Sequence, residues 1–157
     1  MNRRINIGKI DIESIYKDAN VKCKIENEEY LKNQNYILET VNVSNCIENM
    51  LKYKTRKNEK VVFLDVNKVN LDWVDHDNYN LTFNDLKYDT LKSKYLKSRE
   101  DLLNDRVTSP PHITIIDDNN IMFYNGRNRF ANLRDCGALK LPFIIDEYDI
   151  DCFANYE

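Results

Sequence analysis

The sequence contains few residues that interrupt regular structure, with only three glycines and three prolines among its 157 residues. Glycine marks turns because it adopts backbone angles that other residues avoid, and proline because it fixes φ and donates no backbone hydrogen bond. Apart from Gly8, all of them follow residue 109, namely Pro110, Pro111, Gly126, Gly137 and Pro142. The turns that can be located from sequence are therefore concentrated in the last third of the chain.

The sequence also lacks paired cysteines and long apolar runs. Its cysteines are far apart and form no Cys-x-x-Cys pair, namely Cys23, Cys46, Cys136 and Cys152. No apolar segment approaches the roughly 20 residues that span a bilayer, and residues 1–4 do not lead into the apolar run of a secretory signal. We therefore predict a soluble protein with free thiols in a reducing cytoplasm and no membrane partner.

Charge and composition indicate one globular domain whose overall electrostatic field does not attract nucleic acid. The formal net charge is −3, so any basic binding surface has to be local. Apolar residues make up 42% of the chain, which is enough to bury one core at this length. We predict a single domain over residues 1–157, with an N-terminal extension (1–58), a core (59–147) and an acidic tail (148–157). The tail is expected to pack through Tyr148, Ile150 and Phe153.

Hydrophobic patterns predict an α/β (α+β) fold, a small mixed sheet with flanking helices. Continuous or alternating apolar residues predict strands at residues 21–25, 61–66, 113–116, 121–124 and 141–145. Helical spacing predicts helices at residues 44–51, 85–103 and 126–137. The polar segment 67–84 is predicted to be a long loop, with its tryptophan, Trp73, in the core.

The helix at residues 85–103 is rich in basic side chains, namely Lys87, Lys92, Lys94, Lys97 and Arg99. Basic residues on the polar side of an amphipathic helix usually face solvent, and we predict that they do so here. The alternative is a local basic surface that binds a protein or a nucleic acid.

The segment 124–137 combines a tight turn with arginines at the start of a helix. Free backbone N–H groups at a helix N-terminus and arginine side chains both favour an anion, and glycine lets a phosphate approach the backbone. We predict a phosphate-binding or ligand-binding site, with Asn125 as the helix cap, made of Asn125, Gly126, Arg127, Asn128 and Arg129.

Arg129 is the residue on which this prediction depends most. At 3.6 residues per turn, Arg127 and Arg129 lie about 200° apart around the helix, so we do not expect them to hold the same group. We assign the ligand contact to Arg129, and Arg127 faces solvent, the substrate or an acid such as Asp65. The alternative is that Arg129 pairs with a buried carboxylate and only ties the helix to the sheet.

The run of residues 121–131, with 133–137 and 141–144 behind it, resembles the ParB/sulfiredoxin-like superfamily. The shared signature is a strand, a Gly-x-x-Arg turn, a helix that ends in glycine and a strand that opens near proline, here Gly126, Arg129, Gly137 and Pro142. The most similar members are uncharacterised ParB-like proteins with a Gly-Arg-His-Arg-Phe-Ala turn. The resemblance covers residues 61–146, and it implies a mixed sheet whose turn binds nucleotide phosphates.

The sequence departs from the family in two features, and each argues against one of the activities that the resemblance implies. Arg127 stands where a sulfiredoxin has its catalytic cysteine, which argues against sulfiredoxin chemistry because the thiolate nucleophile is missing. The chain also lacks an evident helix-turn-helix segment after the motif, which argues against chromosome partitioning.

Two residues outside the turn are candidates for catalysis. Asp65 ends the strand at 61–66 and is a candidate general base or magnesium ligand, or alternatively a turn former. His112 opens the strand before the motif and is a candidate acid/base group, or alternatively a plain strand residue. We assign no metal site, because His76 between Asp75 and Asp77 is a faint signal on its own.

These observations lead to three hypotheses of function. The first is a ParB-like protein that binds a nucleotide or another phosphorylated ligand, such as a nucleoside triphosphate with Mg²⁺, with hydrolysis or phosphoryl transfer left open. The second is a non-catalytic accessory module that binds a protein or a nucleic acid and acts for a phage or mobile element, for example against host defence. Abundant Asn, Lys and Ile beside few Ala indicate an AT-rich genome of that kind. The third is a ParB-like nuclease.

Overall fold

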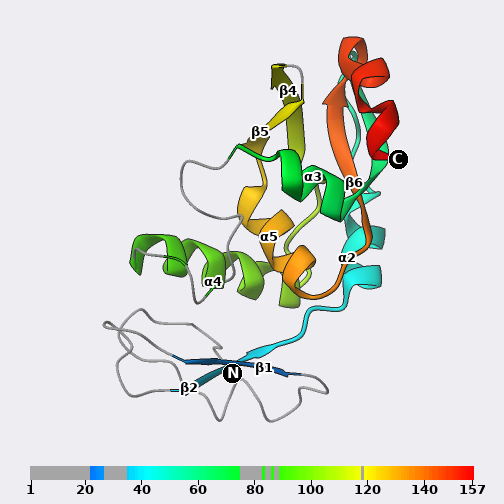
Figure 1. Ribbon diagram of the computed structural model, residues 1–157. Helices are drawn as coiled ribbons and strands as arrows, with labels where there is room; N and C mark the ends of the chain where they lie inside the picture. The colour runs from blue at the N-terminus through cyan, green and yellow to red at the C-terminus, as the bar shows by residue number, and fades with distance from the viewer. Residues whose placement is uncertain (1–21, 27–34, 75–82, 84–85, 87–88, 118) are drawn as a thin grey trace.

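The computed structural model describes residues 22–26, 35–74, 83, 86, 89–117 and 119–157. They form a four-stranded mixed sheet with helices beside it and a separate two-stranded sheet (Figure 1), which confirms the predicted α+β class. None of the described helices is both long and apolar enough to cross a membrane. The elements in chain order are β1 (Lys22–Glu26), β2 (Asn35–Glu39), α2 (Val43–Met50), β3 (Glu59–Asp65), α3 (Val66–Asp72), α4 (Asp89–Leu103), β4 (His112–Asp117), β5 (Asn120–Asn125), α5 (Arg127–Asp135), β6 (Lys140–Asp146) and the 3-10 helix η3 (Glu147–Tyr156).

Strand β6 lies inside the larger sheet, whose order is β3-β6-β4-β5. It pairs antiparallel with β3 and parallel with β4, and β4 pairs antiparallel with β5. Residues 141–145 of β6 are all buried, as expected for an apolar run with a neighbouring strand on each side. Pairing of His112 with Asn125 places the β5–α5 turn beside the beginning of β4.

Aromatic rings hold α5 against the sheet. Phe130 is fully buried, and its ring centroid lies 5.0 Å from that of Phe123 in β5 and 5.8 Å from that of Phe143 in β6. Trp73 contacts Phe130 edge to face at 5.6 Å and is 6% exposed, which confirms its predicted place in the core. Tilted and T-shaped ring pairs at these distances are favourable, so the first turn of α5 has a well-defined position on the sheet.

Polar contacts join α4 to α5. Arg99 is 2% exposed, and the Nε of its guanidinium donates to Oδ1 of Asn132 (2.7 Å). Its two terminal nitrogens donate to the Tyr95 hydroxyl and to the Glu39 carbonyl, both at 2.9 Å. The side chain of Asn132 in turn donates to the carbonyl oxygens of Tyr95 and Asn128 at 2.9 Å. This network fixes α4 between α5 and the end of β2 (Figure 1).

The prediction that the basic residues of α4 face solvent is wrong for two of them. Arg99 is buried because it finds three acceptors, and Lys92 is buried with its ammonium group 5.8 Å from the ring centre of Phe83. Lys94 and Lys97 are exposed as predicted, and Lys87 lies outside the described residues.

The polar segment after β3 begins with a helix, so the predicted loop is wrong over residues 67–72. The carboxylate of Asp65 caps α3 by accepting a hydrogen bond from the Lys68 N–H (2.9 Å), and Val66 and Val69 are buried beneath it. A capped helix of seven residues with two buried valines is too short to give a clear helical period in sequence. Residues 75–82 of the predicted loop, including His76, lie outside the described part of the chain.

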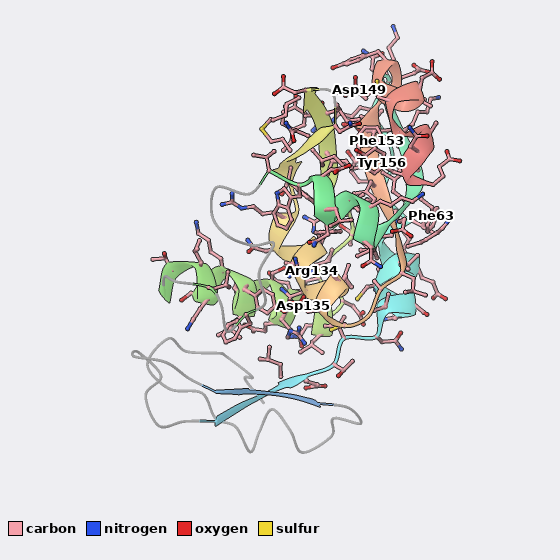
Figure 2. The ribbon with its side chains drawn as sticks, viewed as in Figure 1. Phe63, Arg134, Asp135, Asp149, Phe153 and Tyr156 are labelled. Atoms are coloured by element: carbon pink, nitrogen blue, oxygen red, sulfur yellow. The ribbon has the colours of Figure 1, made fainter. Side chains whose placement is uncertain are left out.

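The predicted acidic tail is the helix η3, and it packs closely. Phe153 and Tyr156 are buried with ring centroids 5.6 Å apart, on the side of η3 that faces the sheet (Figure 2). The Tyr156 hydroxyl donates to the carboxylate of Asp72 in α3 (2.6 Å). Packing through Phe153 is confirmed, whereas Tyr148 is 77% exposed and its predicted packing is wrong.

Replacing Arg99 with methionine should lower the free energy of unfolding by about 2–4 kcal/mol, because buried acceptors on Asn132 and Glu39 would lose their donor. Lys97→Met on the same helix is the control, since its side chain is 62% exposed and its ion pair with Asp101 is worth less than about 1 kcal/mol. Urea denaturation followed by circular dichroism measures both. Equal losses in the two variants would contradict the structural role of Arg99.

Candidate functional site

A groove of about 800 Å³ lies between α4 and the turn that joins β5 to α5. One wall is a single face of α4, and the other is the turn with the first residues of α5. The lining residues are Ser93, Lys94, Lys97, Ser98, Asp101, Val107, Phe123, Tyr124, Asn125, Gly126, Arg127, Asn128 and Arg129. All of the ligand-binding residues predicted from sequence, 125–129, therefore lie on this groove.

Gly126 is the N-cap of α5 and has a left-handed backbone, with φ of 85°. The prediction that Asn125 caps the helix is wrong, because Asn125 is still the last residue of β5. A Cβ at position 126 would lie 2.8 Å from Cα of Pro111. Glycine is thus required here both by the backbone angle and by the close approach of the loop before β4.

The first turn of α5 carries backbone donors at the wall of the groove. The first hydrogen bond of the helix runs from the Phe130 N–H to the Gly126 carbonyl (2.9 Å). Among the described residues, no group accepts from the N–H of Asn128 or Arg129. Unpaired N–H groups and the helix dipole together favour an anion at this end of the helix.

Arg129 points from the groove wall toward the loop before β4. One terminal nitrogen donates to the Ser109 carbonyl, to the Ser109 hydroxyl (2.9 Å) and to the Pro110 carbonyl (3.3 Å). No carboxylate of the described residues pairs with it, so the predicted buried ion pair is absent from the described part of the chain, and these contacts tie the helix to the loop. Burial lowers the pKa of its guanidinium below the usual value. Arg129 is therefore a partly buried cation without a counter-ion in the described structure.

Arg127 and Asn128 line the same groove as Arg129, and both are partly buried. Oδ1 of Asn128 is buried and has no hydrogen-bond partner among the described residues. A buried acceptor without a partner costs about 1–3 kcal/mol. Oδ1 of Asn128 could therefore turn toward a ligand in the groove without losing a hydrogen bond.

The α4 wall adds further basic side chains, which sequence reasoning assigned to a solvated surface. Lys94 is exposed, and Lys97 pairs with Asp101 (2.9 Å), the one carboxylate among the described residues that line the groove. Asp101 also pairs with Arg106 (2.8 Å). In this described lining, four basic side chains face one acidic side chain, so the local charge of the groove is opposite in sign to the net charge of the chain.

The two residues predicted as catalytic candidates do not line this groove. Asp65 lies on β3, at the opposite edge of the sheet from β5, and its carboxylate caps α3. The alternative assignment, a turn former, is closer to its observed role, which is the N-cap of α3.

His112 reaches the groove only through a neighbour. Its ring packs edge to face on Tyr124, with centroids 5.2 Å apart, and Tyr124 lines the groove. Its Nε2 is buried without a hydrogen-bond partner among the described residues and lies 3.9 Å from Oδ1 of Asp146. His112 is thus placed to hold the Tyr124 ring.

The groove fits a phosphate better than it fits Mg²⁺. Arginine side chains and helix N–H groups are phosphate donors, whereas the carboxylate of Asp101 is already engaged by two basic residues. The described part of the chain contains no group of three or more His, Cys, Asp or Glu side chains suited to a metal ion.

Comparison with known proteins gives no further assignment, since no family model, no curated protein and no solved structure matches the chain.

Gly126→Ala should destabilise the protein more than Gly137→Ala. Both glycines have φ of 85°, so alanine adds backbone strain of about 1–2 kcal/mol at either position. Only at 126 does the new Cβ meet Pro111, whereas nothing lies within 4 Å of a Cβ at 137. We expect an additional loss of about 1–3 kcal/mol for Gly126→Ala in urea denaturation. Equal stabilities of the two variants would refute the close approach at Pro111.

Proposed function

We propose that the groove between α4 and the β5–α5 turn binds the phosphate group of a nucleotide or of another phosphorylated ligand. The observation that carries this proposal is that Arg129 is a partly buried cation without a counter-ion among the described residues. Arg129 lines the groove, its guanidinium contacts the carbonyl and hydroxyl oxygens of the loop before β4, and no carboxylate neutralises it among the described residues. Because burial disfavours the charged form, an anion in the groove would recover part of that cost.

Other features of the turn support the same ligand. The α5 N-terminus carries about half a positive charge, and two of its N–H groups have no acceptor among the described residues. The resemblance of the motif to ParB-like proteins adds to this, because its shared positions, Gly126 and Arg129, both lie on the groove.

The arrangement supports binding rather than turnover. Hydrolysis or phosphoryl transfer needs a base within hydrogen-bond reach of the nucleophile, and neither Asp65 nor His112 lines the groove. Asp101 lines it but is held by Lys97 and Arg106. The nuclease hypothesis has the same difficulty, because the described residues contain no acidic cluster for metal ions.

Arg129→Lys should weaken nucleotide binding by about tenfold, because lysine keeps the charge but cannot make a bidentate contact with phosphate. Isothermal titration calorimetry with ATP, ADP, CTP and GTP, each with and without Mg²⁺, measures the affinity.

Arg56→Lys is the matched control, since the Arg56 side chain is 84% exposed and does not line the groove. Circular dichroism of both variants checks that they fold. Absence of binding heat for every nucleotide with the native chain would refute the proposal.

A further inference from the structure

The face of the sheet that points away from α5 carries exposed aromatic rings. Successive side chains of a strand point to opposite faces. Because Phe123 packs under Phe130 of α5, its neighbour Tyr124 lies on the other face. Tyr124 is 57% exposed, and Tyr148, two residues after β6, is 77% exposed. Aromatic rings are enriched where a protein surface contacts a partner, so this face is a candidate docking surface.

Both rings are held around one carboxylate, that of Asp146. The Tyr148 hydroxyl donates to Oδ2 of Asp146 (2.8 Å). The Tyr124 ring packs edge to face on His112 with centroids 5.2 Å apart, and Nε2 of His112 lies 3.9 Å from Oδ1 of Asp146. The hydrogen bond to Asp146 raises the pKa of Tyr148. The carboxylate of Asp149 and the Tyr124 hydroxyl raise this pKa further, which shows that these groups are neighbours.

The two carboxylates of this surface lack a close counter-ion. Oδ1 of Asp146 lies beyond hydrogen-bond distance of His112, and no other basic group of the described residues pairs with Asp146. Asp149 accepts from the Thr114 hydroxyl (3.1 Å) and likewise has no ion pair in the described structure. The Asp146 side chain is 21% exposed, so a ligand can reach it. Two such carboxylates beside two electron-rich rings attract a cation.

A guanidinium group suits this arrangement better than other charged groups do. It makes bidentate hydrogen bonds with a carboxylate and stacks on aromatic faces, whereas an ammonium group is a point charge. A phosphate would be repelled by Asp146 and Asp149. The charge of the surface is therefore complementary to an arginine side chain.

The same face continues to the edge strand β3, where another ring is exposed. Phe63 is 42% exposed and pairs with Pro142 of β6 (Figure 2). Since Pro142 precedes Asp146 by four residues on this strand, Phe63 and Asp146 share one face. A small cation would not reach both, whereas a protein segment can lie across several strands.

We propose that this face docks a basic segment of a partner protein, with an arginine guanidinium on the carboxylate of Asp146 beside the rings of Tyr124 and Tyr148. His112 is a positioning residue that holds the Tyr124 ring. The surface uses none of the basic residues of the groove, so it is independent of the proposed phosphate site.

Fluorescence anisotropy of the full chain with a labelled ten-residue peptide, (Gly-Arg)5, tests the proposal. We expect this peptide to bind at least about fivefold more tightly than (Gly-Lys)5, and (Gly-Gln)5 not to bind. By competition, N-acetylarginine amide should bind at least about twentyfold more weakly than (Gly-Arg)5, which is more than the statistical gain from five arginines. Phe63→Ser should weaken the peptide but not N-acetylarginine amide.

Asp146→Asn keeps an acceptor for the Tyr148 hydroxyl but removes the charge, and it should weaken the arginine peptide about tenfold. Asp151→Asn is the control, since Asp151 is an exposed carboxylate of the same helix η3, and it should change the affinity less than about twofold. Circular dichroism checks that both variants fold.

Tyr124→Ala and Tyr148→Ala should each weaken the peptide by about two- to fivefold, the range of an exposed cation–π contact. Leu71→Ala is the control for loss of an exposed apolar side chain, since Leu71 is 81% exposed on α3. His112→Ala should weaken the peptide as well, and His112→Phe, which restores a ring contact with Tyr124, should recover the affinity.

Equal affinity for the arginine and glutamine peptides, or equal affinity of the native chain and Asp146→Asn, would overturn the proposal. Binding of (Gly-Lys)5 as tight as that of (Gly-Arg)5 would overturn the assignment to a guanidinium group. Binding of N-acetylarginine amide as tight as that of the peptide would overturn the protein partner. Each of these results would leave the phosphate site standing, because nucleotide binding is measured separately and depends on Arg129.

Discussion

The buried guanidinium of Arg99 is the interaction on which the arrangement of the helices depends. A buried cation is costly unless its donors are satisfied, and here three of them reach Asn132 in α5, Tyr95 in α4 and the Glu39 carbonyl at the end of β2. These acceptors belong to three different elements. The three hydrogen bonds can therefore form together only when α4 lies at a particular distance from α5. The width of the groove follows from this, because its two walls are the outer face of α4 and the first turn of α5.

The hydrogen bonds of Arg99 continue through other side chains and connect α4 and α5 to α3. The Tyr95 hydroxyl accepts from Arg99 and donates to the carboxylate of Asp135 (2.7 Å), which also accepts from Arg134 (2.8 Å; Figure 2). Arg134 then donates to the amide oxygen of Asn70 in α3 (2.8 Å). Burial raises the pKa of Tyr95, so its hydroxyl keeps the proton that Asp135 accepts. A chain of side chains thus joins α4, α5 and α3, while the rings around Phe130 hold α5 on the strands.

The parts of the fold that could be predicted are those whose signals are local. The strands before and after α5 are apolar runs separated by Gly126 and Gly137, and the site residues 125–129 are contiguous, so they occupy one turn wherever the chain goes. The α4 wall could not be found in this way. Its contact with the turn depends on a pairing of Arg99 with Asn132, 33 residues apart, and periodicity assigns an arginine to the solvated face. The role of Asp65 as the N-cap of α3 could not be found for a similar reason, because its place at the end of β3 does not reveal that α3 starts there.

Gly126 is required by the shape of the β5–α5 turn. In sequence, glycine before two arginines indicates a backbone left open for phosphate. In the structure, the left-handed φ and the contact with Pro111 are each enough to require glycine at this position, whether or not a ligand binds. The glycine therefore explains the shape of the turn and is neutral on its ligand. What favours an anion is the electrostatics around the turn: Arg129 is partly buried without a counter-ion among the described residues, the N–H groups of Asn128 and Arg129 have no acceptor there, and the lysines of α4 line the opposite wall.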